Sequence, residues 1–154
     1  ESYPEDHLGA RGSTYTWPFV RSRDGTVVDM RRVPPPSVRW QELHHAVELD
    51  AGWLALTDPE MREGVALAFD TQVFDTVWLW LVYGGWRELY AATLEAWTGY
   101  PAKLSEAASS GRCATLAPGQ SLEAETHLIA YSGLKAVESV APDGQVVGSS
   151  DEEP

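Results

Sequence analysis

The stretch of sequence that decides the fold is an unbroken apolar run, Val77-Trp78-Leu79-Trp80-Leu81-Val82-Tyr83, which Gly84-Gly85 closes. Valine and aromatic residues favour extended backbone, so the run predicts a β-strand within residues 74–83. Successive side chains of a strand point to opposite faces, which places Trp78 and Trp80 on one face and Tyr83 on the other. Apolar side chains on both faces favour a strand buried between layers. The alternative is that the two indoles line a concave site where sugar rings stack.

Short apolar runs recur on both sides of this stretch, and many of the 13 Gly and 10 Pro residues lie between them. The expected strands cover residues 16–20, 27–28, 46–50, 53–57, 65–69, 88–97, 113–116 and 122–131. Short turns rather than crossover helices connect most of them, which indicates antiparallel sheets. We expect one hairpin turn at Ala51-Gly52, a second hairpin between 113–116 and 122–131, and one helix over 102–109. The sequence therefore predicts an all-β antiparallel β-sandwich.

A chain of 154 residues is long enough to bury a core of its own. We predict a polar lead-in over residues 1–14, a single β-sandwich domain over 15–140, and a flexible acidic tail over 141–154.

Charge and composition exclude several classes of partner. The chain has 11 Lys and Arg residues against 23 Asp and Glu residues, a formal net charge of −12, which argues against binding to nucleic acid or to an anionic membrane surface. No apolar run approaches the ~18 residues of a membrane-spanning helix. Cys113 is the single cysteine and cannot form an internal disulfide. With no secretory signal visible, we expect a cytoplasmic protein.

The residue that points most directly to chemistry is Glu95. Strand alternation places its side chain between those of Thr93 and Trp97 on one face. A carboxylate on an apolar face is costly unless it is paired or partly hydrated, and such a carboxylate is a candidate general base. The alternative is an exposed glutamate at the end of the strand, or an ion pair with Arg87 or Lys103.

The adjacent histidines His44 and His45 are the other candidates for acid–base or metal chemistry. Neighbours on a strand point to opposite faces, so at most one of them could enter a given pocket. No cluster of acids and histidines has the spacing of metal ligands, and no phosphate-binding or dinucleotide-binding motif is present. We therefore expect surface or loop histidines, no metal and no cofactor.

Several motifs occur in an order that resembles a known family. They are Asp58-Pro59, the set Asp70, Phe74, Trp78 and Trp80, then Tyr83-Gly84-Gly85, the run Tyr90-Ala91-Ala92-Thr93-Leu94-Glu95-Ala96-Trp97-Thr98-Gly99-Tyr100-Pro101, and Leu116-Ala117-Pro118-Gly119-Gln120-Ser121. Together they resemble the C-terminal half of the aldose 1-epimerase, or galactose mutarotase-like, superfamily. The resemblance covers residues 45–132.

This resemblance implies half of a large β-sandwich and a protein that acts on carbohydrate. Glu95 would be the general base of an isomerase that interconverts the anomers of a free sugar. Trp78, Trp80, Tyr83 and Trp97 would be candidate substrate-binding residues.

The sequence departs from the family in one respect that bears on function. Domains of the family are longer, and their catalytic histidines lie in the half that has no counterpart here. The alternative is therefore a carbohydrate-binding or structural β-sandwich module without catalysis. Because half of a sandwich exposes apolar edges, a second copy of the chain or a complementing subunit is the expected protein partner.

Overall fold

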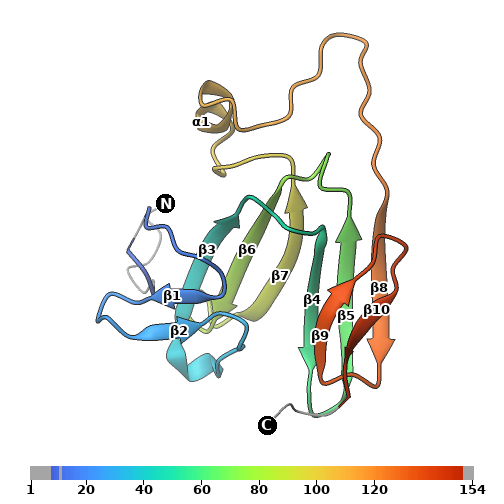
Figure 1. Ribbon diagram of the computed structural model, residues 1–154. Helices are drawn as coiled ribbons and strands as arrows, with labels where there is room; N and C mark the ends of the chain where they lie inside the picture. Colours follow the sequence, from blue (N-terminus) through green and yellow to red (C-terminus); the bar gives the residue numbers. More distant parts are fainter. Residues whose placement is uncertain (1–7, 11, 151–154) are drawn as a thin grey trace. The chain divides into compact units, whose positions relative to one another are not determined.

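The structure is a computed structural model that describes residues 8–10 and 12–150. These residues form strands β1 (Phe19–Arg21), β2 (Val27–Asp29), β3 (Trp40–Ala46), β4 (Trp53–Asp58), β5 (Glu63–Phe69), β6 (Thr76–Tyr83), β7 (Tyr90–Trp97), β8 (Thr126–Ser132), β9 (Ala136–Val140) and β10 (Val146–Ser149), the 3-10 helix η1 (Pro36–Val38) and the helix α1 (Leu104–Ser109). The strands form sheets in the orders β1-β2, β3-β6-β7, β4-β5-β8 and β10-β9, with neighbouring strands antiparallel (Figure 1). The predicted all-β antiparallel fold is confirmed.

Contacts within the chain divide it into two compact units, where chain length predicted one domain over 15–140. Unit 1 comprises Glu1–His44 and Leu79–Thr93, and unit 2 comprises His45–Trp78 and Leu94–Pro154. Each unit has its own cluster of buried apolar side chains, and each is described by itself below.

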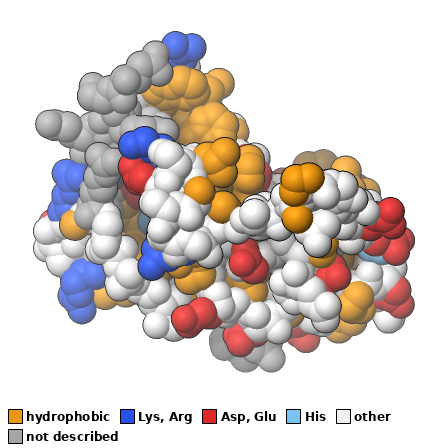
Figure 2. All heavy atoms as spheres, turned by 90° about the horizontal axis from the view of Figure 1, so that it is seen from above, with side chains coloured by type: hydrophobic (Ala, Val, Ile, Leu, Met, Phe, Trp, Pro, Cys, Tyr) orange, Lys and Arg blue, Asp and Glu red, His pale blue; other side chains and the backbone are white. Residues whose placement is uncertain are grey.

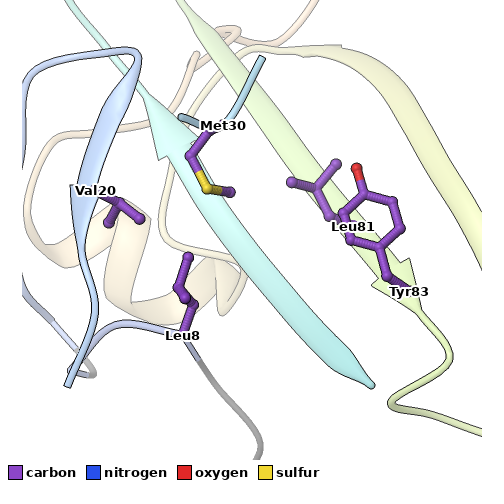
Figure 3. Packing of buried hydrophobic residues seen from close by; sticks show 5 residues of the cluster. All are labelled: Leu8, Val20, Met30, Leu81 and Tyr83. Atoms are coloured by element: carbon purple, nitrogen blue, oxygen red, sulfur yellow. The ribbon is translucent and has the colours of Figure 1, made fainter. Parts of the chain in front are cut away.

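The core of unit 1 joins the β1-β2 hairpin to one face of β6 (Figure 3). Its buried members are Leu8, Val20, Met30, Leu81 and Tyr83. Leu81 and Tyr83 lie two residues apart on β6 and therefore share a face, as the alternation predicted. Leu8 is only 7% exposed, so at least this part of residues 1–14 belongs to the core instead of a polar lead-in. Residues 1–7 and 11 lie outside the described residues.

A buried acid on β3 connects the start of the described chain to the sheet. Glu42 is 4% exposed and accepts a hydrogen bond from the backbone N–H of Leu8. Its Oε2 lies 3.2 Å from Nε2 of His44, whose ring meets that of Tyr15 edge-on at 5.5 Å. Burial, and then the Glu42 charge, raises the pKa of Tyr15 to about 12. The expectation that His44 is a surface or loop residue was wrong, because it lies on β3 with its side chain 14% exposed.

Unit 2 is a two-layer arrangement in which the β9-β10 hairpin packs on the β4-β5-β8 sheet. Ala66 and Ala68 of β5 are completely buried and pack with Val140 of β9. Because alanine is small, the two layers can approach closely there. Strand β10 lies inside residues 141–154, so the prediction of a flexible tail is wrong for that segment. Its adjacent valines, Val146 and Val147, favour extended backbone. Residues 151–154 lie outside the described residues.

Two predicted hairpins are absent from the described residues. Of the predicted strand over 46–50, only Ala46 lies in a strand, as the last residue of β3, and β4 pairs with β5 instead of with a preceding strand. The backbone oxygen of Gly52 accepts the N–H of Phe69 at 2.8 Å, and a Cβ at position 52 would overlap the Phe69 carbonyl oxygen. Gly52 therefore allows the backbone at Phe69 to approach closely, and it is not part of a two-residue turn. Likewise β8 pairs with β5, while Cys113 of the predicted 113–116 strand forms only an isolated bridge with Gly99.

The helix α1 lies within the predicted range of 102–109 and is followed by Gly111 in a left-handed conformation, with φ of 68°. A glycine just beyond the last turn is a common helix stop because it has no Cβ to clash there. Among the described residues, no helix combines the length and apolar character needed to cross a membrane.

Candidate functional site

The start of β6 and the end of β7 place two tryptophans in face-to-face contact in unit 2. The rings of Trp78 and Trp97 stack with centroids 4.2 Å apart and an interplanar angle of 17°. The indole N–H of Trp78 donates to the carbonyl oxygen of Gly99 at 3.0 Å, which fixes the ring at the base of the stack. Trp97 is 41% exposed, so the pair reaches the surface.

Glu95 lies beside this stack and is held by it. The indole N–H of Trp97 donates to Oε2 of Glu95 at 2.6 Å. The two residues are two positions apart on β7, so they share a face as strand alternation requires. Glu95 is half-buried. The two cations considered as ion-pair partners of Glu95 contact other groups. The Arg87 guanidinium lies over the Trp86 ring, and Lys103 binds Glu106 at 2.9 Å.

His45 and Tyr100 complete this aromatic cluster. The sequence made His45 a candidate for acid–base or metal chemistry but predicted it at the surface or in a loop, and it gave Tyr100 no role in the site. The His45 ring meets Trp78 edge-on at 5.2 Å and lies 6.0 Å from the Tyr100 ring. The guanidinium of Arg112 lies over Tyr100, 4.9 Å from the ring centroid. The expectation of a surface or loop position was therefore also wrong for His45.

The prediction that the two histidines point to opposite faces is confirmed. His44 contacts Glu42 and Tyr15 of unit 1, whereas His45 contacts Trp78 of unit 2. A strand predicted over the residues of β3 would have assigned His44 and His45 to different surroundings, because strand alternation separates the two side chains. The sequence did not predict this strand, because Trp40 is its one residue of a type enriched in strands.

The remaining predicted substrate-binding residues, Trp80 and Tyr83, belong to unit 1 and do not join this cluster. Trp80 contacts Trp86 with ring centroids 6.0 Å apart. Tyr83 is 4% exposed and packs in the core, and burial raises the pKa of its hydroxyl. A side chain so buried has no ring face to offer a sugar.

Unit 2 also contains a cavity of about 310 Å³. It is lined by Val47, Glu48, Leu49, Thr71, Asp75, Thr76 and Tyr100. Tyr100 is the residue that the cavity shares with the aromatic cluster, and Glu95 is not part of the lining.

The arrangement around Glu95 combines a flat apolar surface with a strong hydrogen-bond acceptor. Figure 2 shows apolar and acidic side chains lying near one another on the surface drawn there. An indole face excludes water from C–H groups, and a carboxylate accepts hydrogen bonds from hydroxyls. In the part of the chain that the structure describes, no three His, Cys, Asp or Glu residues are grouped to hold a metal ion.

Comparison with known proteins gives no relative from which a role could be transferred. No family model matches the chain, and neither a curated protein nor a solved structure matches it.

Proposed function

We propose that this protein binds carbohydrate at the Glu95 site, which we define as Glu95, Trp97 and Trp78. The observation on which this depends is the hydrogen bond from the Trp97 indole to the Glu95 carboxylate, beside a Trp97 ring that is 41% exposed and stacked on Trp78. The site can make two interactions with a sugar: the indole face packs against the C–H face of the ring, and the carboxylate accepts hydrogen bonds from the hydroxyls.

The site is organised before any ligand arrives. Stacking on Trp78 and the bond to Glu95 together restrict the Trp97 side chain to one orientation. The binding of a ligand that packs on Trp97 therefore carries little entropic cost for ordering that side chain. The carboxylate retains acceptor capacity, because an ionised carboxylate can accept several hydrogen bonds at once.

The sequence supports the same substrate class. The run Tyr90–Trp97 and the residues after it resemble the segment that carries the general base in aldose 1-epimerases. The acidic net charge of −12 suits a neutral ligand better than nucleic acid or an anionic membrane. With one cysteine in the chain, we place this activity in a reducing compartment such as the cytoplasm.

Removal of the exposed indole tests the binding proposal. Trp97→Ala is expected to weaken the binding of free hexoses by at least about tenfold, because the truncation removes the ring on which the sugar would pack. Glu95→Gln is expected to weaken it by about tenfold, because a charged acceptor becomes a neutral one. Ligand-observed NMR titration against a panel of free sugars measures both effects.

Trp17→Ala is the matched control, since Trp17 is 49% exposed and belongs to unit 1. It should leave sugar affinity unchanged. Equal affinity in the wild type and in Trp97→Ala would reject the site, and so would a loss of binding in Trp17→Ala alone.

A second candidate function is anomer interconversion, and the position of His45 favours it. His45 packs against Trp78 while Glu95 bonds to Trp97, so an acid–base pair flanks one indole stack. Glu95 would take the proton of the anomeric hydroxyl and an acid would protonate the ring oxygen. The bond between the anomeric carbon and that oxygen breaks, the open chain rotates, and reclosure gives the other anomer.

Optical rotation of freshly dissolved α-glucose or α-galactose measures this reaction. Loss of the general base in Glu95→Gln should slow a catalysed reaction by about 10²–10⁴-fold. If the wild-type protein does not accelerate the change in rotation, the function is binding alone.

A further inference from the structure

The cavity of unit 2 has a chemistry different from that of the Glu95 site. Its walls come from the connection between β3 and β4 (Val47, Glu48, Leu49), the connection between β5 and β6 (Thr71, Asp75), the first residue of β6 (Thr76), and Tyr100 after β7. Three separate stretches of one unit therefore meet around it.

Local hydrogen bonds fix the β5–β6 wall of the cavity. Oδ1 of Asp70 accepts the N–H of Gln72, and the backbone oxygen of Asp70 accepts the N–H of Phe74, each at 2.8 Å. This closed turn contains Thr71 and is followed directly by Asp75, so it sets the backbone positions of both residues. On the opposite connection, Glu48 has a left-handed backbone with φ of 56°, which bends the chain sharply at the cavity wall.

The lining is acidic and rich in hydroxyls. Glu48 and Asp75 supply two carboxylates, Thr71, Thr76 and Tyr100 supply hydroxyls, and the lining contains no Lys, Arg or His. Thr76 is 1% exposed and its hydroxyl donates to Oδ1 of Asp75 at 2.9 Å, which anchors that carboxylate. Val47 and Leu49 add apolar wall.

We propose that this cavity is a second binding site, for a small primary amine that also bears hydroxyl groups, such as an amino sugar. Its volume of about 310 Å³ suits a single small ring, at the lower end of the ~300–1,000 Å³ of ligand pockets. Two carboxylates without a cation in the lining favour an ammonium group, which makes charge-assisted hydrogen bonds to them. The hydroxyls of the lining pair with those of the ligand.

The proposal does not depend on the Glu95 site, because the two sites share no residue. Glucosamine is the probe, at a pH where its amine is protonated, with glucose and N-acetylglucosamine as neutral probes of similar shape. All titrations use Trp97→Ala as the background, so that binding at the Glu95 site does not contribute. Isothermal titration calorimetry should show glucosamine binding at least about tenfold tighter than either neutral sugar, and binding should weaken as salt is added.

The double substitution Glu48→Gln and Asp75→Asn should weaken glucosamine binding by at least about tenfold in that background. Both residues are exposed, so the variant is expected to fold, and circular dichroism is the check. The matched control is Glu123→Gln with Glu125→Gln, which removes the same charge at exposed positions outside the cavity. Unchanged binding in the cavity variant overturns the proposal, as does equal affinity for glucosamine and glucose.

The two proposals fail in different ways. If glucosamine binds the wild type but not Trp97→Ala, the ligand occupies the Glu95 site and the cavity proposal is wrong. If the double substitution, made in the wild-type chain, leaves glucose binding unchanged and lowers glucosamine affinity to that of glucose, both sites stand.

Discussion

Gly52→Ala is expected to lower the free energy of unfolding by about 3 kcal/mol. The added Cβ would overlap the carbonyl oxygen of Phe69, and this oxygen belongs to backbone that cannot rotate away. The same two residues are joined by the hydrogen bond from Phe69 N–H to Gly52 O, so relief of the overlap would break a contact at the start of β4. Urea unfolding followed by tryptophan fluorescence measures the loss.

Gly9→Ala is the control for this substitution. A Cβ at position 9 meets its nearest neighbour, Oγ of Ser13, at 3.6 Å, which is ordinary van der Waals distance. Its stability should stay within about 1 kcal/mol of the wild type. If Gly52→Ala proves as stable as Gly9→Ala, the described pairing of β4 with the end of β5 is wrong.

Glu42→Ala is expected to destabilise unit 1 by about 3 kcal/mol, because it removes one partner from a buried polar group. The carboxylate is 4% exposed, accepts the N–H of Leu8 and lies 3.2 Å from Nε2 of His44. Without it, the Leu8 amide loses its acceptor and the buried imidazole loses its charged neighbour. Urea unfolding of the variant and of the wild type gives the difference.

Glu42→Gln separates the charge from the hydrogen bond. The amide oxygen can still accept the Leu8 N–H, so the loss of stability should be smaller than that in Glu42→Ala. The Glu42 charge helps raise the pKa of Tyr15 to about 12, so the amide variant should lower that pKa toward the usual value near 10. Ultraviolet titration of tyrosinate, with Tyr15→Phe to assign the step, measures the change. An unmoved Tyr15 pKa would contradict the described contact.

The elements that the sequence predicted well are those whose own residues determine them. The apolar run of β6 and the alternating run of β7 each carry a strand pattern, and alternation alone places Glu95 and Trp97 on one face. The shared face brings the two side chains within reach of each other, but the hydrogen bond between them was not predicted and is shown by the structure.

The elements that it missed depend on partners distant in the sequence. Strand β3 contains Gln41, Glu42 and two histidines, a pattern that does not favour extended backbone by itself. For β8 the predicted strand over 122–131 exists, but its predicted partner was wrong: β8 pairs with β5, and their nearest paired residues, Phe69 and Thr126, lie 57 positions apart in the sequence. Such pairing is set by packing over the whole sheet and not by local residue preference. Because β3 was not predicted, the contact of His45 with Trp78 was not predicted either.

The most direct test of the account is the resonance of the Trp97 indole N–H during titration with a free hexose. That proton is donated to Glu95, whereas the Trp78 indole N–H is donated to the Gly99 carbonyl. Because hydroxyls of a bound sugar would compete for the same carboxylate, the Trp97 signal should move saturably, and the Trp17 signal should stay fixed. A Trp97 resonance that remains unmoved while the sugar binds elsewhere would contradict the account.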